Sequence, residues 1–398
     1  MKLLIDRVYR AMWCTLALCI RHFIKTKNNK VICWSFLFEQ YGCNPKYISE
    51  YILKYCEESF DIVWVIKKNV ETNSIPSKIR IVRPNTFKYL QELYSAKFVI
   101  SNIRNMRSAN YFFKKANQIY IMTWHGPFAL KKIEFDAIDS LGSSYIRQMK
   151  DDNRICDLML SSCTFFTSLI RNAFMYKGEI LEKGAPRNDL FFDIGKKDQI
   201  REKIFNDYNI PNNTKIVTYA PTFRNDKEAS HYKLNWRNII PAFEEMLGAP
   251  VIVFLRLHPV SIGIIDIDSL IQDDKIRNMT SYNDMQELIL ISEVLITDYS
   301  STMFEMGILN KICILYADDV DSYERGFYFD VKNLPFRFAE NECQLTEIVR
   351  NFDFETYFAE LKEFNNNKLN IFDNGQASAS VVKWMLDKCS ANKHREYA

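Results

Sequence analysis

Short apolar segments that alternate with helical stretches constrain this chain more than any other feature. Each segment is apolar at consecutive positions, which is typical of parallel strands covered by helices on both faces. In the first half they are Val31–Phe36, Ile62–Ile66, Ile79–Val82, Phe98–Ser101, Ile119–Thr123 and Leu158–Ser161. We therefore predict a doubly wound α/β domain.

The pattern restarts after the charged stretch Gly195–Lys203 and the turn Ile210–Asn213, which together indicate a domain boundary. The strands expected beyond it are Ile216–Tyr219, Val251–Leu255, Ile276–Met279, Val294–Thr297 and Ile312–Tyr316. Two doubly wound domains are expected to face each other across a cleft at the carboxyl ends of their strands.

The predicted division of the chain has four parts. Residues 1–28 form an amphipathic helix, 29–195 a first Rossmann-like domain, 196–372 a second, and 373–398 a C-terminal helix that packs back on the first domain.

Composition and spacing exclude several classes of protein. Lysine and arginine total 52 against 49 aspartates and glutamates, a net charge of +3 that is too even for a nucleic-acid-wrapping chain. A zinc or thioredoxin motif requires a C-x-x-C pair, and the ten cysteines include none. No two glycines are spaced G-x-G, so the dinucleotide fingerprint is absent. We expect neither a metal nor a cofactor, and we interpret Asp266–Asp268 and Asp319–Asp321 as solvated loops.

The N-terminal segment Lys2–Ile24 predicts an amphipathic helix. Its apolar part, Ala11–Ile20, is too short to cross a bilayer, and the cations after it do not suit a signal peptide. Two interpretations stay open. The helix lies in the headgroup plane of an anionic membrane, or it packs on the first domain as a core helix.

The segment Val294–Glu305 carries the strongest local signal. A strand ends at Thr297, and hydroxyls of Ser300, Ser301 and Thr302 gather where a helix begins, which favours phosphate binding. The alternative is that a serine only caps the helix. Glu305 lies one turn further on, where a carboxylate can accept hydrogen bonds from ribose hydroxyls.

Two other strands of the second domain end in polar residues. Arg256 and His258 lie at the end of one strand, and a phosphate between them would relieve the burial of the guanidinium. A second strand runs into a proline turn with Thr222 and Arg224.

In the first domain, His125 follows a strand and is the best candidate for a general base. Gly126 would allow close approach of a substrate, and Lys131 and Lys132 follow. Gly184–Asp189 is a polar turn near the domain junction.

Together these segments resemble the CDP-glycerol glycerophosphotransferase family of teichoic acid and capsule synthesis. The matching motifs, in the family's order, are Trp124-His125-Gly126 with Lys131-Lys132, Gly184-x-Pro186-Arg187-Asn188-Asp189, Tyr219–Arg224, Leu257-His258-Pro259, Thr297–Ser301 and Gly326–Asp330. The resemblance implies a GT-B fold and a metal-independent transfer of glycerol phosphate from CDP-glycerol to a hydroxyl of a membrane-associated acceptor, with release of CMP.

The resemblance also implies roles for individual residues. It makes His125 the base and His258 a second catalytic histidine near the donor phosphates. The donor side comprises Thr222, Arg224, Arg256, His258, Asp298, Ser300, Ser301, Thr302 and Glu305. The acceptor side comprises Gly126, Lys131, Lys132, Arg187 and Asp189. The run Pro127–Lys131 is one residue longer than the family's usual one, and it borders the expected acceptor pocket.

The expected partners are CDP-glycerol or a related CDP-polyol, a lipid-linked glycan or polyol-phosphate acceptor, and an anionic membrane, with no nucleic acid. The expected location is the cytoplasmic face of the cell membrane, as a peripheral protein. Three alternatives stay open: a transferase that uses another donor such as CDP-ribitol, a GT-B glycosyltransferase that uses a nucleotide sugar, and a catalytically idle scaffold.

Overall fold

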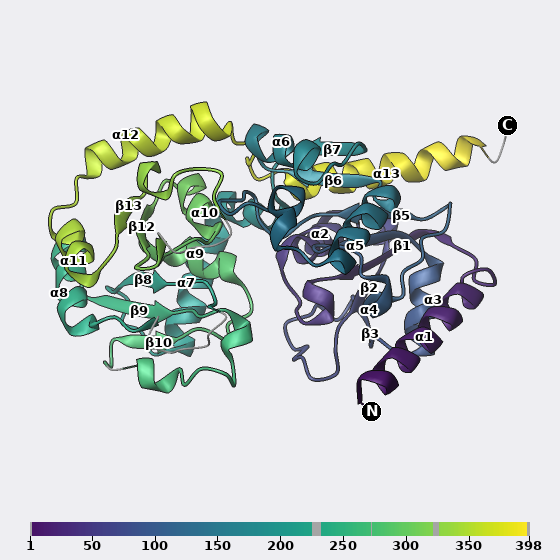
Figure 1. Ribbon diagram of the computed structural model, residues 1–398, viewed down its shortest axis with the longest axis horizontal. Coiled ribbons are helices and arrows are strands. Elements are labelled where there is room, and N and C mark those ends of the chain that lie inside the picture. The colour runs from purple at the N-terminus through teal and green to yellow at the C-terminus, as the bar shows by residue number, and fades with distance from the viewer. Residues whose placement is uncertain (1, 225–231, 272, 321–325, 396–398) are drawn as a thin grey trace. The chain divides into compact units, whose positions relative to one another are not determined.

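The chain forms two α/β units in a computed structural model that describes residues 2–224, 232–271, 273–320 and 326–395 (Figure 1). The first unit contains residues 1–125, 134–189 and 372–398, and the second contains 126–133 and 190–371. From the sequence we assigned residues 126–133 to the first domain, whereas the structure groups them with the second unit.

The first unit is built on a parallel sheet of seven strands in the order β3-β2-β1-β4-β5-β6-β7. The strands are β1 Lys27–Trp34, β2 Asp61–Val65, β3 Arg80–Val82, β4 Ala96–Ser101, β5 Ile119–Met122, β6 Leu158–Ser161 and β7 Glu179–Glu182. The helices are α1 Lys2–Ile20, α2 Cys43–Tyr55, α3 Phe87–Ser95, α4 Arg107–Asn110, α5 Ser143–Ile155, α6 Thr164–Asn172 and α13 Ala377–Arg395. The strand order reverses between β1 and β4, which makes the carboxyl ends of these two strands the switch point.

The second unit has a parallel sheet of six strands in the order β10-β9-β8-β11-β12-β13. The strands are β8 Lys215–Tyr219, β9 Val251–Leu255, β10 Ile276–Asn278, β11 Val294–Thr297, β12 Ile312–Tyr316 and β13 Arg337–Ala339. The helices are α7 Ile194–Asp207, α8 Trp236–Leu247, α9 Met285–Ile291, α10 Thr302–Ile308, α11 Glu342–Arg350 and α12 Phe354–Phe364. Here the order reverses between β8 and β11.

The predicted α/β class with two doubly wound sheets is therefore confirmed. The charged stretch Gly195–Lys203, which we used to mark a boundary, lies inside helix α7. Its Asp193 caps the helix by accepting a hydrogen bond from the Lys196 N–H. A solvated helix and a linker share the same charged composition, so composition alone led us to predict a boundary where the structure has a helix.

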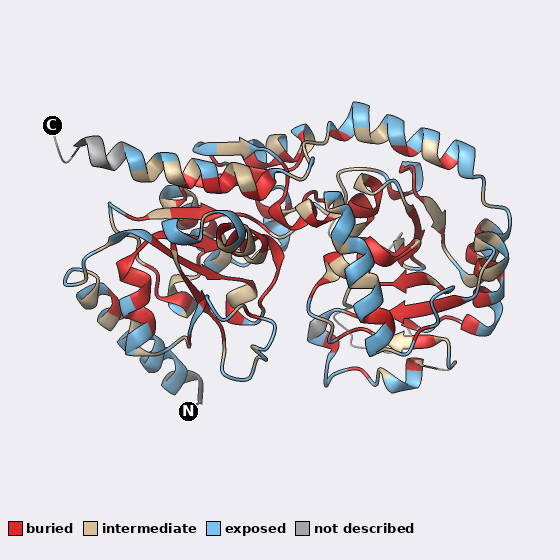
Figure 2. Ribbon diagram, turned by 180° about the vertical axis from the view of Figure 1, so that it is seen from behind, coloured by how far each residue is buried: buried red, intermediate tan, exposed pale blue. Residues whose placement is uncertain are grey.

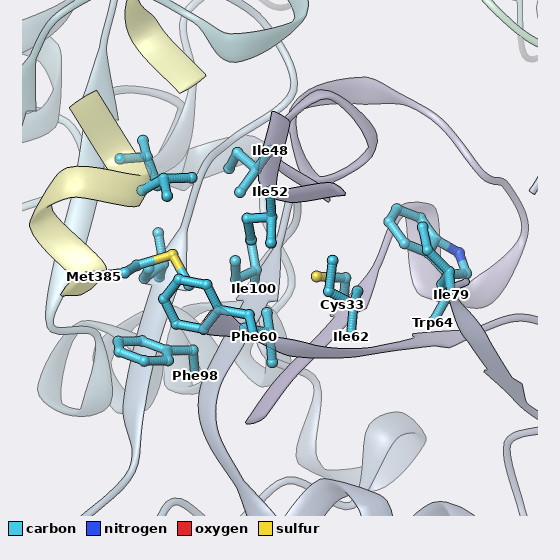
Figure 3. Packing of buried hydrophobic residues seen from close by; sticks show 14 of the residues in the cluster. Cys33, Ile48, Ile52, Phe60, Ile62, Trp64, Ile79, Phe98, Ile100 and Met385 are labelled. Atoms are coloured by element: carbon cyan, nitrogen blue, oxygen red, sulfur yellow. The ribbon is translucent and has the colours of Figure 1, made fainter. Parts of the chain in front are cut away.

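One core cluster of the first unit joins the sheet to two helices (Figure 3). Phe98 and Ile100 of β4 meet Ile48 of α2 and Met385 of α13, all fully buried. Burial of each such side chain stabilises the fold by about 1.5–3 kcal/mol. The C-terminal helix α13 is thus part of the first unit's core.

Helix α1 is held by one face only. Trp13 stacks on Tyr111, with ring centroids 5.9 Å apart, and Ala17 is fully buried. The opposite face is mostly exposed (Figure 2). No helix within the described residues is long and apolar enough to cross a membrane.

Candidate active site

His125 follows β5, the strand next to β4, and its ring is fixed on three sides. Its Nδ1 lies 3.0 Å from the main-chain oxygen of Asn102. Its ring packs against Trp124 and edge-on against Phe36, with centroids 4.4 and 5.8 Å away. Because a carbonyl oxygen only accepts hydrogen bonds, Nδ1 carries the proton and Nε2 keeps a lone pair. This is the tautomer that a general base requires.

The electrostatic surroundings keep this imidazole neutral. The pKa of His125 is lowered to about 4, chiefly by burial and to a smaller extent by the Arg187 charge, against the opposing effect of the Asn102 carbonyl. The neutral form therefore predominates at pH 7.

Arg187 and Asn44 hold the backbone that carries His125. The Arg187 guanidinium donates to the His125 oxygen at 2.7 Å, and the Arg187 N–H donates to the Asn44 amide oxygen at 3.0 Å. The Asn44 amide nitrogen in turn donates to the main-chain oxygens of Thr123 and Trp124. Arg187 thus lies beside His125. We did not select Asn44 from the sequence.

Asp189 has a different environment. Its two carboxylate oxygens accept hydrogen bonds from the Ala377 and Ser378 N–H groups, at 2.9 and 2.7 Å, and so cap helix α13. These contacts tie the Gly184–Asp189 turn to the C-terminal helix. We assigned Asp189 to the acceptor side from the sequence, and that role stays a prediction.

In the second unit, the segment with Lys131 and Lys132 pairs with the Gly326–Asp330 motif. The Lys132 N–H donates to the Gly326 oxygen at 3.0 Å, and the Tyr328 N–H donates to the Leu130 oxygen at 2.8 Å. The same segment starts at Gly126, where a Cβ atom would lie 3.1 Å from the Ser301 hydroxyl oxygen. Glycine here allows the loop backbone to approach the predicted phosphate site closely.

The hydroxyl cluster follows β11 as predicted. The Ser300 hydroxyl accepts hydrogen bonds from the Thr302 N–H at 3.3 Å and from the Thr302 hydroxyl at 2.9 Å. Ser301 occupies the N-cap position of α10, but its side chain makes no capping hydrogen bond. Capping therefore accounts for part of the role of Ser300 and for none of that of Ser301.

Arg224, Thr222 and Asp298 bind one another at the β8/β11 switch point. The Asp298 carboxylate accepts from the Thr222 N–H, the Thr222 hydroxyl and the Arg224 guanidinium, at 3.0, 2.8 and 2.8 Å. Arg224 also pairs with Asp319 at 2.8 Å. The network joins the two loops at the switch point, so these residues support the hydroxyl cluster by fixing its backbone.

The remaining predicted donor residues differ in accessibility. His258 is exposed, and the Val260 N–H donates to its Nδ1 at 3.2 Å. Burial of part of the ring lowers the pKa of His258, and the charges of Arg256 and Lys131 lower it further. Arg256 is 8% exposed and donates to the Met279 oxygen at 3.1 Å.

Glu305 is fully buried and accepts a hydrogen bond from the Gln286 side chain at 3.0 Å. The described residues contain no group of three or more His, Cys, Asp or Glu side chains placed to hold a metal.

Comparison with known proteins shows the family of this chain. Residues 16–387 match the model of the CDP-glycerol:poly(glycerophosphate) glycerophosphotransferase family. A teichoic acid glycerol-phosphate transferase of Staphylococcus aureus is 32% identical over 363 residues, which cover 88% of this chain and 90% of that protein. A teichoic acid poly(glycerol phosphate) polymerase of Staphylococcus epidermidis is 31% identical over 89% of this chain, which spans 50% of the polymerase.

A solved structure of the wall teichoic acid polymerase TagF, a histidine variant soaked with CDPG, superposes with a TM-score of 0.83. It is 28% identical and covers 96% of this chain and 94% of its own. The two-domain GT-B fold and the enzyme class expected from the sequence are thereby confirmed. The chain belongs to the CDP-glycerol:poly(glycerophosphate) glycerophosphotransferase family.

Proposed function

We propose that this chain transfers glycerol phosphate from CDP-glycerol to a hydroxyl of a teichoic-acid-like or capsular acceptor and releases CMP. The observation that carries the proposal is that the second unit contains side chains whose chemistry suits an anion. Ser300, Ser301, His258 and Lys131 combine hydroxyls, an imidazole and an ammonium, the groups that bind a pyrophosphate through charge-assisted hydrogen bonds. Because helix α10 has only seven residues, the proposal rests on these four side chains and not on the N-terminus of the helix.

In the proposed mechanism, the acceptor hydroxyl gives its proton to Nε2 of His125 while its oxygen attacks the phosphorus that bears glycerol. The new phosphorus–oxygen bond forms as the bond to the CMP oxygen breaks, and CMP leaves. The charge that develops on the phosphoryl oxygens is stabilised by His258, Ser300 and Ser301. In the first unit, the tautomer of His125 supports this mechanism. Its Nδ1 donates a hydrogen bond to the Asn102 carbonyl oxygen, so Nε2 is the nitrogen that can accept the proton.

The test is to incubate the full chain with CDP-glycerol, CDP-ribitol and a set of nucleotide sugars, each with a polyol-phosphate acceptor, and to measure the release of CMP and of nucleoside diphosphates. The proposal expects CMP from CDP-glycerol at least about tenfold faster than from CDP-ribitol. Glycerol is the proposed polyol because both relatives named above are glycerol-phosphate enzymes. Turnover of a nucleotide sugar alone would contradict it, and binding without turnover of any donor would favour a scaffold.

We further propose that helix α1 brings the enzyme to an anionic, lipid-bearing membrane surface, at the cytoplasmic face, where a lipid-linked acceptor resides. Ile5, Val8, Tyr9 and Met12 are 60%, 63%, 42% and 53% exposed. They recur at i, i+3, i+4 and i+7, so they form one apolar stripe on the helix. The exposed Arg7 and Arg10 add cations that favour anionic headgroups.

Vesicle co-sedimentation tests this part. The variant Ile5→Gln, Val8→Gln, Met12→Gln should lose binding to vesicles that contain anionic lipid. A matched control is Val260→Gln, Ile262→Gln, Ile264→Gln, a trio of comparable exposure (50%, 53% and 43%) in the second unit. Equal loss in both variants, or loss in the control alone, would contradict a role for α1. Protease protection of the enzyme in intact cells, reversed by lysis, tests the proposed cytoplasmic face.

A further inference from the structure

The turn after β1 is held in an unusual backbone conformation. Phe36, Leu37 and Phe38 have φ values of 44°, 55° and 72°. Residues other than glycine rarely adopt such angles, because their side chains are sterically strained there. The turn is bonded to the neighbouring strand, since the Phe36 N–H donates to the Asn102 amide oxygen at 2.8 Å. This hydrogen bond joins β1 to β4 at the switch point of the first unit.

Asn102 contacts the candidate base by two routes. Its main-chain oxygen binds Nδ1 of His125 directly, at 3.0 Å. Its side-chain oxygen holds the backbone of Phe36, whose ring meets the His125 ring edge-on at 65°. One residue therefore sets both the protonated nitrogen of the imidazole and the aromatic wall beside it.

The other end of the Asn102 amide has no evident structural use. The residue is fully buried, and its amide nitrogen has no hydrogen-bond partner among the described residues. A buried donor without a partner destabilises a fold, because it has given up its hydrogen bonds to water. Folding stability alone therefore does not explain an asparagine at this position.

We propose that Asn102 is a positioning residue for His125. Its main-chain oxygen keeps the ring in the tautomer whose Nε2 accepts the acceptor's proton. Its side chain keeps the Phe36 ring against the imidazole, and only this second contact is lost when the side chain is truncated. The inference rests on the proposed function of His125 as the base. Because the groups proposed to bind the donor belong to the second unit, loss of Asn102 should act on turnover and leave donor binding unchanged.

The chain offers a closely matched control. Asn110 is also fully buried, its side-chain oxygen also accepts one backbone N–H, from Phe112 at 3.2 Å, and its amide nitrogen also lacks a partner among the described residues. None of its hydrogen bonds involves His125 or Phe36. Truncation of either asparagine should therefore destabilise the fold similarly.

The kinetic experiment compares Asn102→Ala with Asn110→Ala in the full chain. We expect kcat to fall about 10–100-fold in Asn102→Ala, as for a misplaced catalytic group, with the KM for CDP-glycerol within a few-fold of wild type. Asn110→Ala should keep its kcat while its melting temperature falls by a similar amount. Equal kcat losses in the two variants, or unchanged kcat in Asn102→Ala, would overturn the inference.

Two further measurements test the inference, and the second does not depend on how well Asn102→Ala folds. In a double-mutant cycle with Phe36→Ala, the losses should be clearly smaller than additive, since both changes remove one contact of the ring. In the unmodified protein, nitrogen NMR of the five histidines, with His125 assigned by its absence in His125→Ala, should show His125 protonated on Nδ1. A proton on Nε2 would overturn the inference even if CMP release confirms the function. Conversely, a chain that releases no CMP would refute the function and leave the tautomer result intact.

Discussion

His125 and His258 each follow a strand of a parallel sheet, but their neighbours fix opposite tautomers. In His125, Nδ1 faces the Asn102 carbonyl and must donate, so Nε2 is left to accept a proton. In His258, Nδ1 accepts from the Val260 N–H, so the proton of the neutral ring lies on Nε2, which can donate. The same side chain is thus suited to act as a base in the first unit and as a hydrogen-bond donor to an anion in the second.

The two surroundings differ in charge as well. Burial is the first cause of the lowered pKa of both histidines, but His258 has two cations, Arg256 and Lys131, that lower its pKa further. His125 has one such cation, Arg187, and its ring packs against the aromatic rings of Phe36 and Trp124. Residue type and strand-end position are therefore the same for the two histidines, and the atom that faces Nδ1 distinguishes them.

The largest effect should come from removal of the base. We expect His125→Ala to lower the transfer rate about 10²–10⁴-fold, with affinity for CDP-glycerol within a few-fold of wild type. His125→Gln should be equally inactive, because an amide has no basic nitrogen. Single-turnover CMP release and calorimetric binding of the donor measure the two quantities. Near-normal turnover in either variant would remove His125 from the mechanism.

His258 should behave in the opposite way. His258→Ala should weaken donor binding about 10–100-fold, since a hydrogen bond to a charged oxygen is worth roughly 1.5–3 kcal/mol. His258→Gln should keep most of the affinity, because its amide N–H can replace the Nε2 donor. If glutamine is as damaging as alanine at this position, the proposed tautomer of His258 is wrong.

Much of this arrangement could be predicted from the sequence. The alternation of apolar runs and helices located the main strands, and polar residues directly after them located His125, His258 and Ser300. Contacts between side chains could not be predicted. Arg224 and Asp298 are 74 positions apart in sequence and bind each other, and Asp189 caps a helix that begins 188 positions later.

Asn102 illustrates the same limit. It follows the predicted strand Phe98–Ser101 directly, as Asp298 follows β11, so its position carried the same signal as the residues we selected. Amide side chains are common in turns, and nothing in the sequence links Asn102 to Phe36 or His125. The link depends on the strand order, which places β1 and β5 on either side of β4.

The two serines of the second unit offer a smaller and sharper contrast. Ser301→Ala should weaken CDP-glycerol binding about tenfold and leave the melting temperature unchanged, because its hydroxyl makes no capping bond. Ser300→Ala should lower both the affinity for CDP-glycerol and the melting temperature, since the Ser300 hydroxyl also accepts hydrogen bonds from the Thr302 N–H and the Thr302 hydroxyl. Calorimetry and thermal unfolding on both variants test this. A stability loss in Ser301→Ala without loss of affinity would show that it serves only as a cap.

The pH dependence of kcat also distinguishes the two histidines, and it is the smallest of the expected effects. Since burial lowers the pKa of His125 from 6.5 to about 4, the base form persists well below neutral pH. A base with the ordinary pKa would be about nine-tenths protonated at pH 5.5. We therefore expect kcat at saturating donor to stay within about twofold between pH 7 and 5.5, and to fall near pH 4. The same acidic limb should appear in His258→Gln.

The linked change in stability has a definite sign. The unfolded chain binds a proton at His125 between pH 6.5 and about 4, whereas the folded chain does not, so folding stability decreases as pH falls through this window. In His125→Ala this decrease should become shallower, measured as the slope of unfolding free energy against pH in urea titrations. Two results together would mean that the imidazole is solvated. They are a fall of kcat near pH 6.5 and, in His125→Ala, an unchanged slope of unfolding free energy against pH. His125 would then resemble the exposed His258, and the contrast between the two sites would rest on tautomer alone.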